Sequence, residues 1–423
     1  MVEREENIQA VHDLATNLLV RNSRKKVVGG REHVYTSASP LYGDQFNWDT
    51  GFAAIALSHI NPEIAQQQIE SMLSRQRADG FIGVVNFWEK MGAAKRLFYS
   101  SYYDGNIPLI SQPPVLSIAE EKIFAASGDT EALLRVLPKL AKNIDYFVDK
   151  RDPDADYLIA AIHPWELGID LTPSGDQFLQ FSSKHPGFLE AYRKMFNIFS
   201  VYKRLGWQED KILASHTYNL ENVMFNVIVA EASRSVARMY QKLGDTANYD
   251  KYWTIAENIK RAILDRCWDE QTGMFYDLDQ NNQQIRVKTI SSLAPLFLEN
   301  LPNKYVDALV GHVHNPKEFW SQFPIPSVAM DEPTFHEKLS RVLWRGQTFV
   351  NTNWLISSGL RKNGHADEAA ALDNKTIDMV VQKGPYEFFS PISGKGGGMK
   401  ELAWDSLIID MAEQLKQPNR KSG

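Results

Sequence analysis

Apolar residues recur at intervals of three and four along most of the chain, a spacing that places them on one face of a helix. We assign such stripe residues, Phe188 and Tyr192 among them, to a buried core. Asn61 and Asp129 stand where a short polar side chain would cap the first turn of a helix. About a dozen helices are predicted at ordinary helix lengths, with clear stripes over residues 8–18, 133–147, 188–202, 252–263, 306–313 and 404–415.

Strand patterns are few, and a short hairpin across an Asn-rich turn is predicted over residues 273–287. Strands and helices do not alternate along the chain as they would in a parallel-sheet fold. No linker, composition shift or fixed repeat divides the chain. We therefore expect one all-α domain over residues 1–423. Its expected form is a closed toroid of alternating inner and outer helices, with minor β-hairpins in the loops and a pocket at the centre.

Composition narrows the class of protein. No apolar run approaches the roughly 20 residues that cross a bilayer, and the charged N-terminus does not resemble a signal peptide. The single cysteine, Cys267, excludes an intramolecular disulfide or a multi-cysteine zinc site. A net charge of -6 argues against nucleic-acid binding. We expect a cytoplasmic protein without nucleic-acid or membrane partners, and the sequence does not indicate its oligomeric state.

The chain is rich in aromatic residues, with 10 Trp, 16 Tyr and 21 Phe. Many stand beside carboxylates and amides in the predicted loops 42–52, 111–115, 163–176, 343–354 and 384–394. Aromatic rings stack on the apolar face of a sugar, while carboxylates and amides bind its hydroxyl groups. Two carboxyl groups beside one bond are what glycoside hydrolysis requires. The loops therefore favour a carbohydrate site.

Structural roles compete with this interpretation. Trp48 and Asp49 could be a buried indole beside a helix cap, and Arg345 could be an ion-pair partner. Helix capping is also the alternative for three carboxylates of the third loop, Glu166, Asp170 and Asp176. Glu387 is harder to explain in this way, because a carboxylate among aromatic residues is costly unless it is paired or used.

Three other motifs are discounted. Asp277, Asp279 and Asn281 have the spacing of a calcium loop, but Asn282 and Lys288 stand where glycine and glutamate are needed. The pair of histidines in residues 312–314 lacks further zinc ligands. Residues 394–398 contain no Gly-Lys-Ser/Thr and are expected to form a flexible loop near a pocket rather than a phosphate loop. We expect no metal and no cofactor.

Taken in order, the loops resemble glycoside hydrolase family 63 and, more distantly, the trehalases. The resemblance extends from about Tyr42 to Trp404 and rests on several short segments. A Trp-Asp pair of the family matches Trp48–Asp49, and its Gln-Pro-Pro segment begins at Gln112. The resemblance implies a six-fold helical toroid, the (α/α)6 fold.

The two catalytic residues are implied by the same resemblance. The family's general acid is the aspartate of a Trp-Glu-Ser-Gly-x-Asp-x-Ser-Pro segment, which falls on Asp170 in residues 165–173. Its general base is a glutamate before an aromatic residue and an Asn-Pro-x-x-Gly turn, which falls on Glu387. A Tyr-Trp-Arg-Gly-Pro segment corresponds to residues 343–347. The substrate-binding residues are then Tyr42, Trp48, Asp49, Gln112, Trp165, Trp344, Arg345 and Trp404.

The resemblance implies an inverting α-glycosidase. The compact length is similar to the branch that hydrolyses mannosylglycerate or glucosylglycerate. Three residues depart from the family pattern: Leu167 replaces serine, Gln347 replaces proline and Phe349 replaces a frequent tryptophan. Phe81 follows Asp-Gly at the position where glycerate-hydrolysing members have histidine. The resemblance therefore does not decide whether glycerate is the leaving group.

Other functions stay open at this point. A trehalase-like enzyme would act on an α-disaccharide through the same carboxyl groups. A sugar isomerase or epimerase would rely on histidine pairs, and among the candidate loops only His163 is available. A non-catalytic sugar-binding protein would keep the aromatic residues without needing Asp170 and Glu387.

Overall fold

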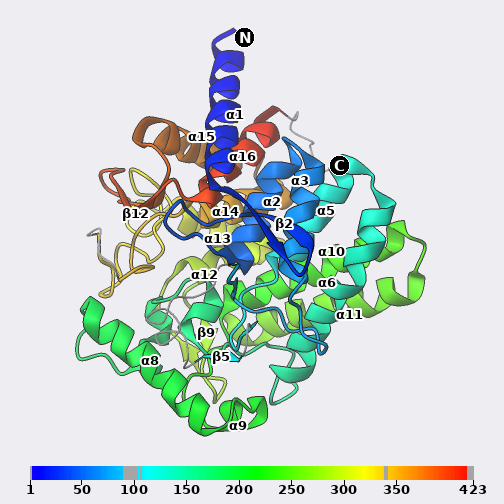
Figure 1. Cartoon of the computed structure of the whole chain (residues 1–423). Helices are drawn as coiled ribbons and strands as arrows, with labels where there is room; N and C mark the ends of the chain where they lie inside the picture. Colours follow the sequence, from blue (N-terminus) through cyan, green and yellow to red (C-terminus); the bar gives the residue numbers. More distant parts are fainter. Residues whose placement is uncertain (1, 89–101, 105–106, 338–341, 417–423) are drawn as a thin grey trace.

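The computed structural model describes residues 2–88, 102–104, 107–337 and 342–416. Helices dominate these residues (Figure 1). The longer ones are α1 Val2–Asn22, α2 Asn47–Ser58, α3 Pro62–Leu73, α5 Val115–Ser127, α6 Thr130–Lys150, α8 Phe188–Arg204, α10 Val223–Lys242, α11 Thr246–Ala262, α13 Asn303–Val313, α14 Val350–Lys362, α15 Ala366–Lys383 and α16 Ile408–Lys416. The shorter ones are α7 Asp176–Leu179, α9 Glu209–Ala214 and α12 Ile290–Leu293.

The predicted helices are confirmed where the apolar stripes were clearest. The six stripes fall in α1, α6, α8, α11, α13 and α16, and the last begins with the 3-10 helix η5, Ala403–Leu407. Both predicted caps form. The side chain of Asn61 accepts a hydrogen bond from the N–H of Ile64 at 3.1 Å, and that of Asp129 accepts one from Ala132 at 2.9 Å. These bonds satisfy N–H groups that have no partner within the helix.

Among the described residues, six inner segments form a closed ring of neighbours. In order, α2 contacts α5, α5 contacts α10, α10 contacts η4 (Ala294–Phe297), η4 contacts α14, α14 contacts η5, and η5 returns to α2. Outer helices cover them: α3 lies on α2 and α5, α11 on α10, and α15 on α14. At the closure, α1 packs beside α16, so segments from the two ends of the chain meet (Figure 1). The fold is the predicted (α/α)6 toroid.

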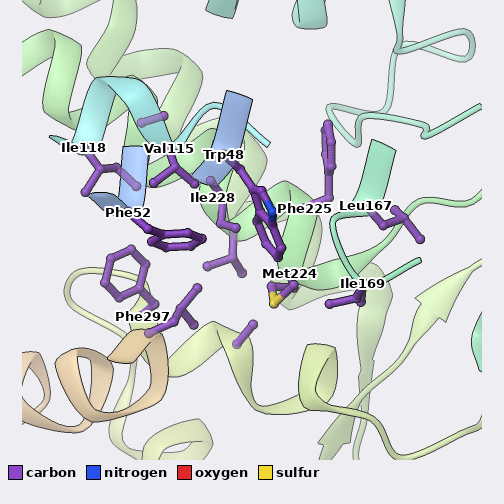
Figure 2. Close-up of a cluster of buried hydrophobic side chains, with 14 of the residues drawn as sticks. Trp48, Phe52, Val115, Ile118, Leu167, Ile169, Met224, Phe225, Ile228 and Phe297 are labelled. Carbon is purple, nitrogen blue, oxygen red and sulfur yellow. The ribbon is translucent and has the colours of Figure 1, made fainter. Parts of the chain in front are cut away.

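Inner and outer helices differ because they bury different fractions of their surface. Every residue of α2 is buried, as is every residue of α10 from Val223 to Ala237. A helix that is covered on all sides needs small or apolar residues all round, whereas an outer helix needs only one apolar stripe. One continuous apolar cluster reaches from Val11 to Ala412. Figure 2 shows part of it, where Trp48, Phe52 and Val115 face Met224 and Phe297.

The described sheets are all two-stranded, and all but that of β3 and β4 are hairpins. The predicted Asn-rich hairpin is confirmed as β9 Asp277–Leu278 paired with β10 Gln284–Ile285. The expectation of a flexible loop at residues 394–398 is wrong for most of that segment, because β12 (Gly396–Lys400) pairs with β11 (Tyr386–Phe389). The hairpin of β1 Ser23–Val28 and β2 Arg31–Thr36 was not predicted. The remaining pairs are β3 Gln45–Phe46 with β4 Val85–Asn86, β5 Tyr103–Asp104 with β6 Ile107–Pro108, and β7 Trp268–Asp269 with β8 Met274–Phe275.

A helix that crosses a bilayer must be both long and apolar. No helix in the described part of the chain meets both requirements.

Candidate active site

Loops from both halves of the chain surround a cavity of about 320 Å³. Nine of the ten residues that the sequence singled out line this cavity: Tyr42, Trp48, Asp49, Gln112, Trp165, Asp170, Trp344, Glu387 and Trp404. The tenth, Arg345, does not. The ring brings these loops together although they are far apart in the sequence, because most of them join or begin a helix of the inner ring.

The first loop is fixed at the start of α2. Trp48 and Asp49 lie in its first turn, where the backbone N–H groups have no partner within the helix. The side-chain oxygen of Gln112 accepts a hydrogen bond from the N–H of Trp48 at 3.2 Å. Gln112 therefore orients the start of α2 and also contributes to the cavity wall.

The segment that carries Asp170 is held by its neighbours in the chain. Leu167 and Ile169 are buried in the core, and Ile169 lies near Met224 (Figure 2). Gly168 has a φ of +72°, and a Cβ atom there would lie only 2.6 Å from the Trp48 ring. Glycine is therefore required for this close approach. The departure at Leu167 is also explained, since a serine at that position would bury less apolar surface.

Glu166 anchors the same loop, and it does not face the cavity. Its carboxylate forms a bidentate ion pair with Arg151, with N–O distances of 2.9 and 3.1 Å, and both side chains are almost completely buried. It also accepts hydrogen bonds from the N–H groups of Ser111 and Ile162, each at 2.9 Å. One carboxylate thus joins the Asp170 loop to the Gln112 loop. Sequence reasoning missed Arg151, which caps the end of α6.

Glu387 lies on β11, and the hairpin with β12 fixes its side chain. Its Oε2 accepts a hydrogen bond from the N–H of Met399 at 2.9 Å. The carboxylate of Asp405 accepts a hydrogen bond from the N–H of Tyr386 at 2.8 Å and so holds the start of the strand. The base candidate is thus attached to a paired strand rather than to a mobile loop.

Indole rings form much of the cavity wall. The Trp48 ring lies 6.1 Å from that of Trp404 and 6.3 Å from that of Trp344. Trp344 stacks on Phe349 with ring centroids 3.5 Å apart. Phe349, a departure from the family pattern, thus supports an indole that faces the cavity. Tyr42 is 39% exposed and lies at the rim.

Two residues that the sequence did not assign to the site also line the cavity, and one of them contacts Trp165. Tyr102 contacts Trp165 edge to face and lines the cavity. Tyr192 also lines the cavity, although its position in a helical stripe predicted only a core role. A stripe identifies the face of a helix that turns inward, and in a toroid that face can meet either the core or the pocket.

His163 does not serve as an acid or base in this arrangement. Its side chain is fully buried, and burial lowers its pKa to about 3. One ring nitrogen lies 3.3 Å from the carbonyl of Met195, and the other accepts a hydrogen bond from the N–H of Trp165. The histidine is therefore neutral, and it orients Trp165.

Arg345 contacts the segment that follows Asp170 and does not line the cavity. Its two terminal nitrogens each donate to a carboxylate oxygen of Asp176 at 2.8 Å, and they also reach the carbonyls of Leu171 and Lys184. The side chain is 2% exposed. Gln347, another departure, accepts a hydrogen bond from the N–H of Arg345 at 3.0 Å. The direct sugar contact of Arg345 stays a prediction, whereas its ion pair with Asp176 is present.

The three carboxyl groups of the cavity differ in their electrostatic surroundings. Burial, then the charge of Glu387 and then that of Asp49, raises the pKa of Asp170 to about 8. Burial is also the main reason that the pKa of Asp49 rises to about 7. It raises the pKa of Glu387 as well, but the hydrogen bond from Met399 opposes that shift. Asp170 is therefore protonated at neutral pH, and Glu387 has a donor that favours its ionised form.

A metal ion would need several ligand atoms that converge on one point. Among the described residues, one set of three carboxylates converges closely enough to hold an ion, namely Asp152, Asp154 and Asp156. None of these lines the cavity of Asp170 and Glu387.

A protonated carboxyl group, a second carboxyl group that can ionise, and an indole wall inside a helical toroid define the class of toroidal glycosidases. Comparison with known proteins agrees. The mannosylglycerate hydrolase MGH1-like glycoside hydrolase domain matches residues 42–404. The chain belongs to this family of glycoside hydrolases, within glycoside hydrolase family 63, and trehalases are more distant relatives.

Individual relatives share about a quarter of their residues with this chain. A mannosylglycerate hydrolase of Rubrobacter radiotolerans is 24% identical over 410 residues, which cover 89% of this chain and 92% of the relative. A glucosylglycerate hydrolase of Mycolicibacterium hassiacum is 23% identical, covering 88% and 93%. The crystal structure of a mannosylglycerate hydrolase from Thermus thermophilus, with Tris and D-glycerate, has a TM-score of 0.83 at 23% identity and covers 95% and 99% of the two chains.

Proposed function

We propose that this glycoside hydrolase is an inverting α-glycosidase that acts on a small α-glucoside or α-mannoside, such as glucosylglycerate or mannosylglycerate. The observation that carries the proposal is that Asp170 and Glu387 enter one cavity with different tendencies to hold a proton. A protonated acid and a carboxyl group that can ionise are what glycoside hydrolysis requires, and the inverting course is the one implied by the family resemblance. The relatives named for the two glycerate glycosides support the substrate class.

In this mechanism Asp170 is the general acid. Its proton moves to the glycosidic oxygen as the bond from that oxygen to the anomeric carbon breaks, so the leaving group departs as a neutral alcohol. The raised pKa keeps the proton in place at neutral pH until the substrate arrives. Burial strengthens the effect, because a newly formed carboxylate in the cavity interacts strongly with the positive charge that develops on the sugar ring.

Glu387 is the general base. It accepts a proton from a water molecule, which attacks the anomeric carbon from the face opposite the leaving group. In inverting enzymes the two carboxyl groups stand about 6.5–9.5 Å apart, which leaves space for that water. The hydrogen bond from Met399 holds one oxygen of Glu387, whose side chain lines the cavity.

The remaining wall residues hold the sugar. Trp48, Trp344 and Trp404 offer ring faces and edges for the C–H surfaces of a pyranose, while Asp49 and Gln112 offer polar atoms for its hydroxyl groups. A cavity of about 320 Å³ lies at the small end of the size range of small-molecule sites, about 300–1,000 Å³. That size favours a small glycoside over a polymer. The cytoplasmic location expected from the sequence stays a prediction.

The test combines a substrate panel with two variants. Mannosylglycerate, glucosylglycerate, trehalose and kojibiose are each incubated with the enzyme, and the released monosaccharide is measured. We expect Asp170→Asn and Glu387→Gln each to lower kcat on the best substrate by about 10²–10⁴-fold. Asp250→Asn, an exposed position on α11, should leave kcat unchanged.

Proton NMR of the fresh product decides the stereochemistry. The β-anomer should form first, and an initial α-anomer would overturn the inverting mechanism. Unchanged rates in both variants would exclude the assigned acid and base. Hydrolysis of trehalose with none of the glycerate glycosides would replace the proposed substrate by an α-disaccharide.

A further inference from the structure

A hollow of about 630 Å³ lies apart from the catalytic cavity and shares none of its lining residues. Most of its wall comes from the later turns of α5, α10 and α14. The catalytic cavity lies at the other ends of two of these helices, since Gln112 precedes α5 and Trp344 precedes α14. The hollow is therefore at the opposite end of the ring, and the reaction proposed above uses none of its residues.

Four cationic side chains line the hollow: Lys122 of α5, Arg238 of α10, and Arg361 and Lys362 of α14. Their side chains are only 19–31% exposed. The C-terminal end of a helix favours cations in its last turn, which explains Arg361 and Lys362. It does not explain Lys122 and Arg238, which stand before the last turns of α5 and α10. This concentration of positive charge occurs in a chain whose net charge is -6.

The carboxylates that pair with two of these cations lie behind the wall. Asp410 accepts a hydrogen bond from Lys122 at 2.8 Å and is 1% exposed. Asp373 pairs with Arg361 and is completely buried. Neither aspartate lines the hollow. A ligand in the hollow would therefore meet these two cations without displacing their carboxylates.

Two carboxylates do line the hollow, and both are held by cations. Glu121 accepts two hydrogen bonds from Arg238. Glu231 pairs with Lys362 at 2.8 Å and with the buried Arg234 at 3.2 Å. The wall thus carries four cations and two carboxylates, an excess of two positive charges.

Hydrogen-bond donors also remain on these cations. An arginine side chain has five N–H donors and a lysine has three. Within the described part of the chain, the side chain of Arg361 donates to Asp373 alone, and that of Lys122 to Asp410 alone. Lys362 makes two hydrogen bonds and keeps one donor. Because charge-assisted hydrogen bonds are the strong ones, an anion is the ligand that these donors favour.

Two aromatic side chains line the hollow beside the cations. The rings of Phe297 and Trp354 have centroids 5.7 Å apart, and the ammonium group of Lys362 lies 3.7 Å from the centroid of Phe297. Aromatic surface of this kind packs against the apolar part of a ligand. The volume is within the range of small-molecule sites, about 300–1,000 Å³, and an inorganic ion would fill only part of it.

We propose that this hollow binds a small organic phosphate. Lys122, Arg361 and Lys362 would donate to the phosphate oxygens, and the carbon skeleton would lie against Phe297. A phosphate monoester carries close to two negative charges at neutral pH and offers three acceptor oxygens, so it matches the excess of two positive charges. A single carboxylate would offset only one of them. The site goes beyond the proposed glycosidase reaction and does not depend on it.

The experiment measures binding and thermal stability on the full chain in a phosphate-free buffer. Calorimetric titration with glucose 6-phosphate should show one site, and Tm should rise with its concentration, because a ligand that binds only the folded state stabilises it. Glucose is the control without a phosphate group, and inorganic phosphate is the control without a carbon skeleton. Each should bind at least about tenfold more weakly than glucose 6-phosphate.

Two variants of the wall test where the phosphate binds. Lys122→Gln removes charged donors, while Asp410 keeps two other partners. Ser358→Glu adds a carboxylate to the wall without removing a member of an ion pair. Each should weaken the binding of glucose 6-phosphate at least about tenfold. Lys242→Gln, at an exposed position of α10 outside the hollow, should bind like the wild type.

The outcomes are separable. No binding heat together with an unchanged Tm would overturn the proposal, as would equal affinity of the wild type and both wall variants for glucose 6-phosphate. Equally tight binding of glucose, or of inorganic phosphate, would overturn the assignment to an organic phosphate. If a variant does not fold, as judged by circular dichroism, the three titrations of the wild-type chain decide alone. None of these results depends on glycosidase activity.

Discussion

A methyl group at Gly398 would overlap Oε2 of Glu387, so the catalytic base candidate can occupy its position only because residue 398 is glycine. Gly398 also has a φ of +70°, a backbone conformation that other residues rarely adopt. A Cβ atom at Gly396 would lie 2.2 Å from the Tyr386 ring, and one at Gly397 would lie 2.5 Å from the Phe388 ring. The glycine run is therefore a strand that packs tightly over β11.

We expect Gly398→Ala to displace the Glu387 carboxylate and lower kcat by about 10²-fold, since a misplacement of about 1 Å can have that effect. The chain should remain folded, because the change affects one edge of a two-stranded hairpin. Steady-state kinetics with circular dichroism checks both points. Gly187→Ala is the matched control, since a Cβ atom there meets no other atom within 4 Å. A fully active Gly398→Ala enzyme would show that Glu387 does not need this position.

The pH dependence of kcat/KM should report the two carboxyl groups. Activity requires Glu387 to be ionised, and burial raises the pKa of Glu387. The acid limb of the pH profile should therefore lie above the ordinary pKa of a glutamate. Activity also requires Asp170 to be protonated, so it should fall as pH rises through about 8. A rate that stays constant from neutral pH up to about pH 10 would contradict the role of Asp170 as the acid.

Asp49 offers a way to move the alkaline limb without removing a catalytic group. Its negative charge is the third cause of the raised pKa of Asp170, after burial and Glu387. Asp49→Asn removes that charge, so Asp170 should lose its proton at lower pH, by less than about one pH unit because burial remains. KM should rise as well if Asp49 binds a sugar hydroxyl. The same profile for Asp13→Asn, an exposed position on α1, should match the wild type.

The ion pair of Arg345 and Asp176 can be tested for its effect through the Asp170 loop. Asp176→Asn leaves a buried guanidinium without its carboxylate and should lower the free energy of unfolding by about 2–3 kcal/mol. Arg345→Lys cannot reproduce two parallel hydrogen bonds and should have a similar effect. Both variants should lower kcat with little change in KM. A large rise in KM for Arg345→Lys alone would instead indicate a direct sugar contact.

Local sequence patterns were sufficient to predict the helices and most of the residues that line the cavity. The stripes of α6 and α8 and the caps at Asn61 and Asp129 depend on neighbours in sequence, so the sequence alone predicts them. The cavity residues were found because aromatic and carboxylate side chains occur together in loops that also match a family pattern. Tyr102 was missed because it lies outside the loops that were matched, and Tyr192 because its helical stripe assigned it to the core.

Long-range pairing was decided only by the tertiary structure. The partner of Glu166 is Arg151, and that of Arg345 is Asp176. Such pairs depend on which loops the ring brings together, and composition cannot reveal them. The flexible loop expected at the glycine run near Glu387 was wrong for the same reason, since its strand exists only by pairing with β11.

The sequence by itself determined the helical class of the fold, the chemistry of the loops and the two carboxyl groups proposed for catalysis. Helical periodicity and loop composition are local properties, and the resemblance of the loop segments to a family pattern implied the two carboxyl groups. The tertiary structure decided that Asp170 holds its proton and that Arg345 pairs with Asp176 instead of lining the cavity. Those outcomes depend on burial and on charges from distant segments, which exist only once the ring has closed.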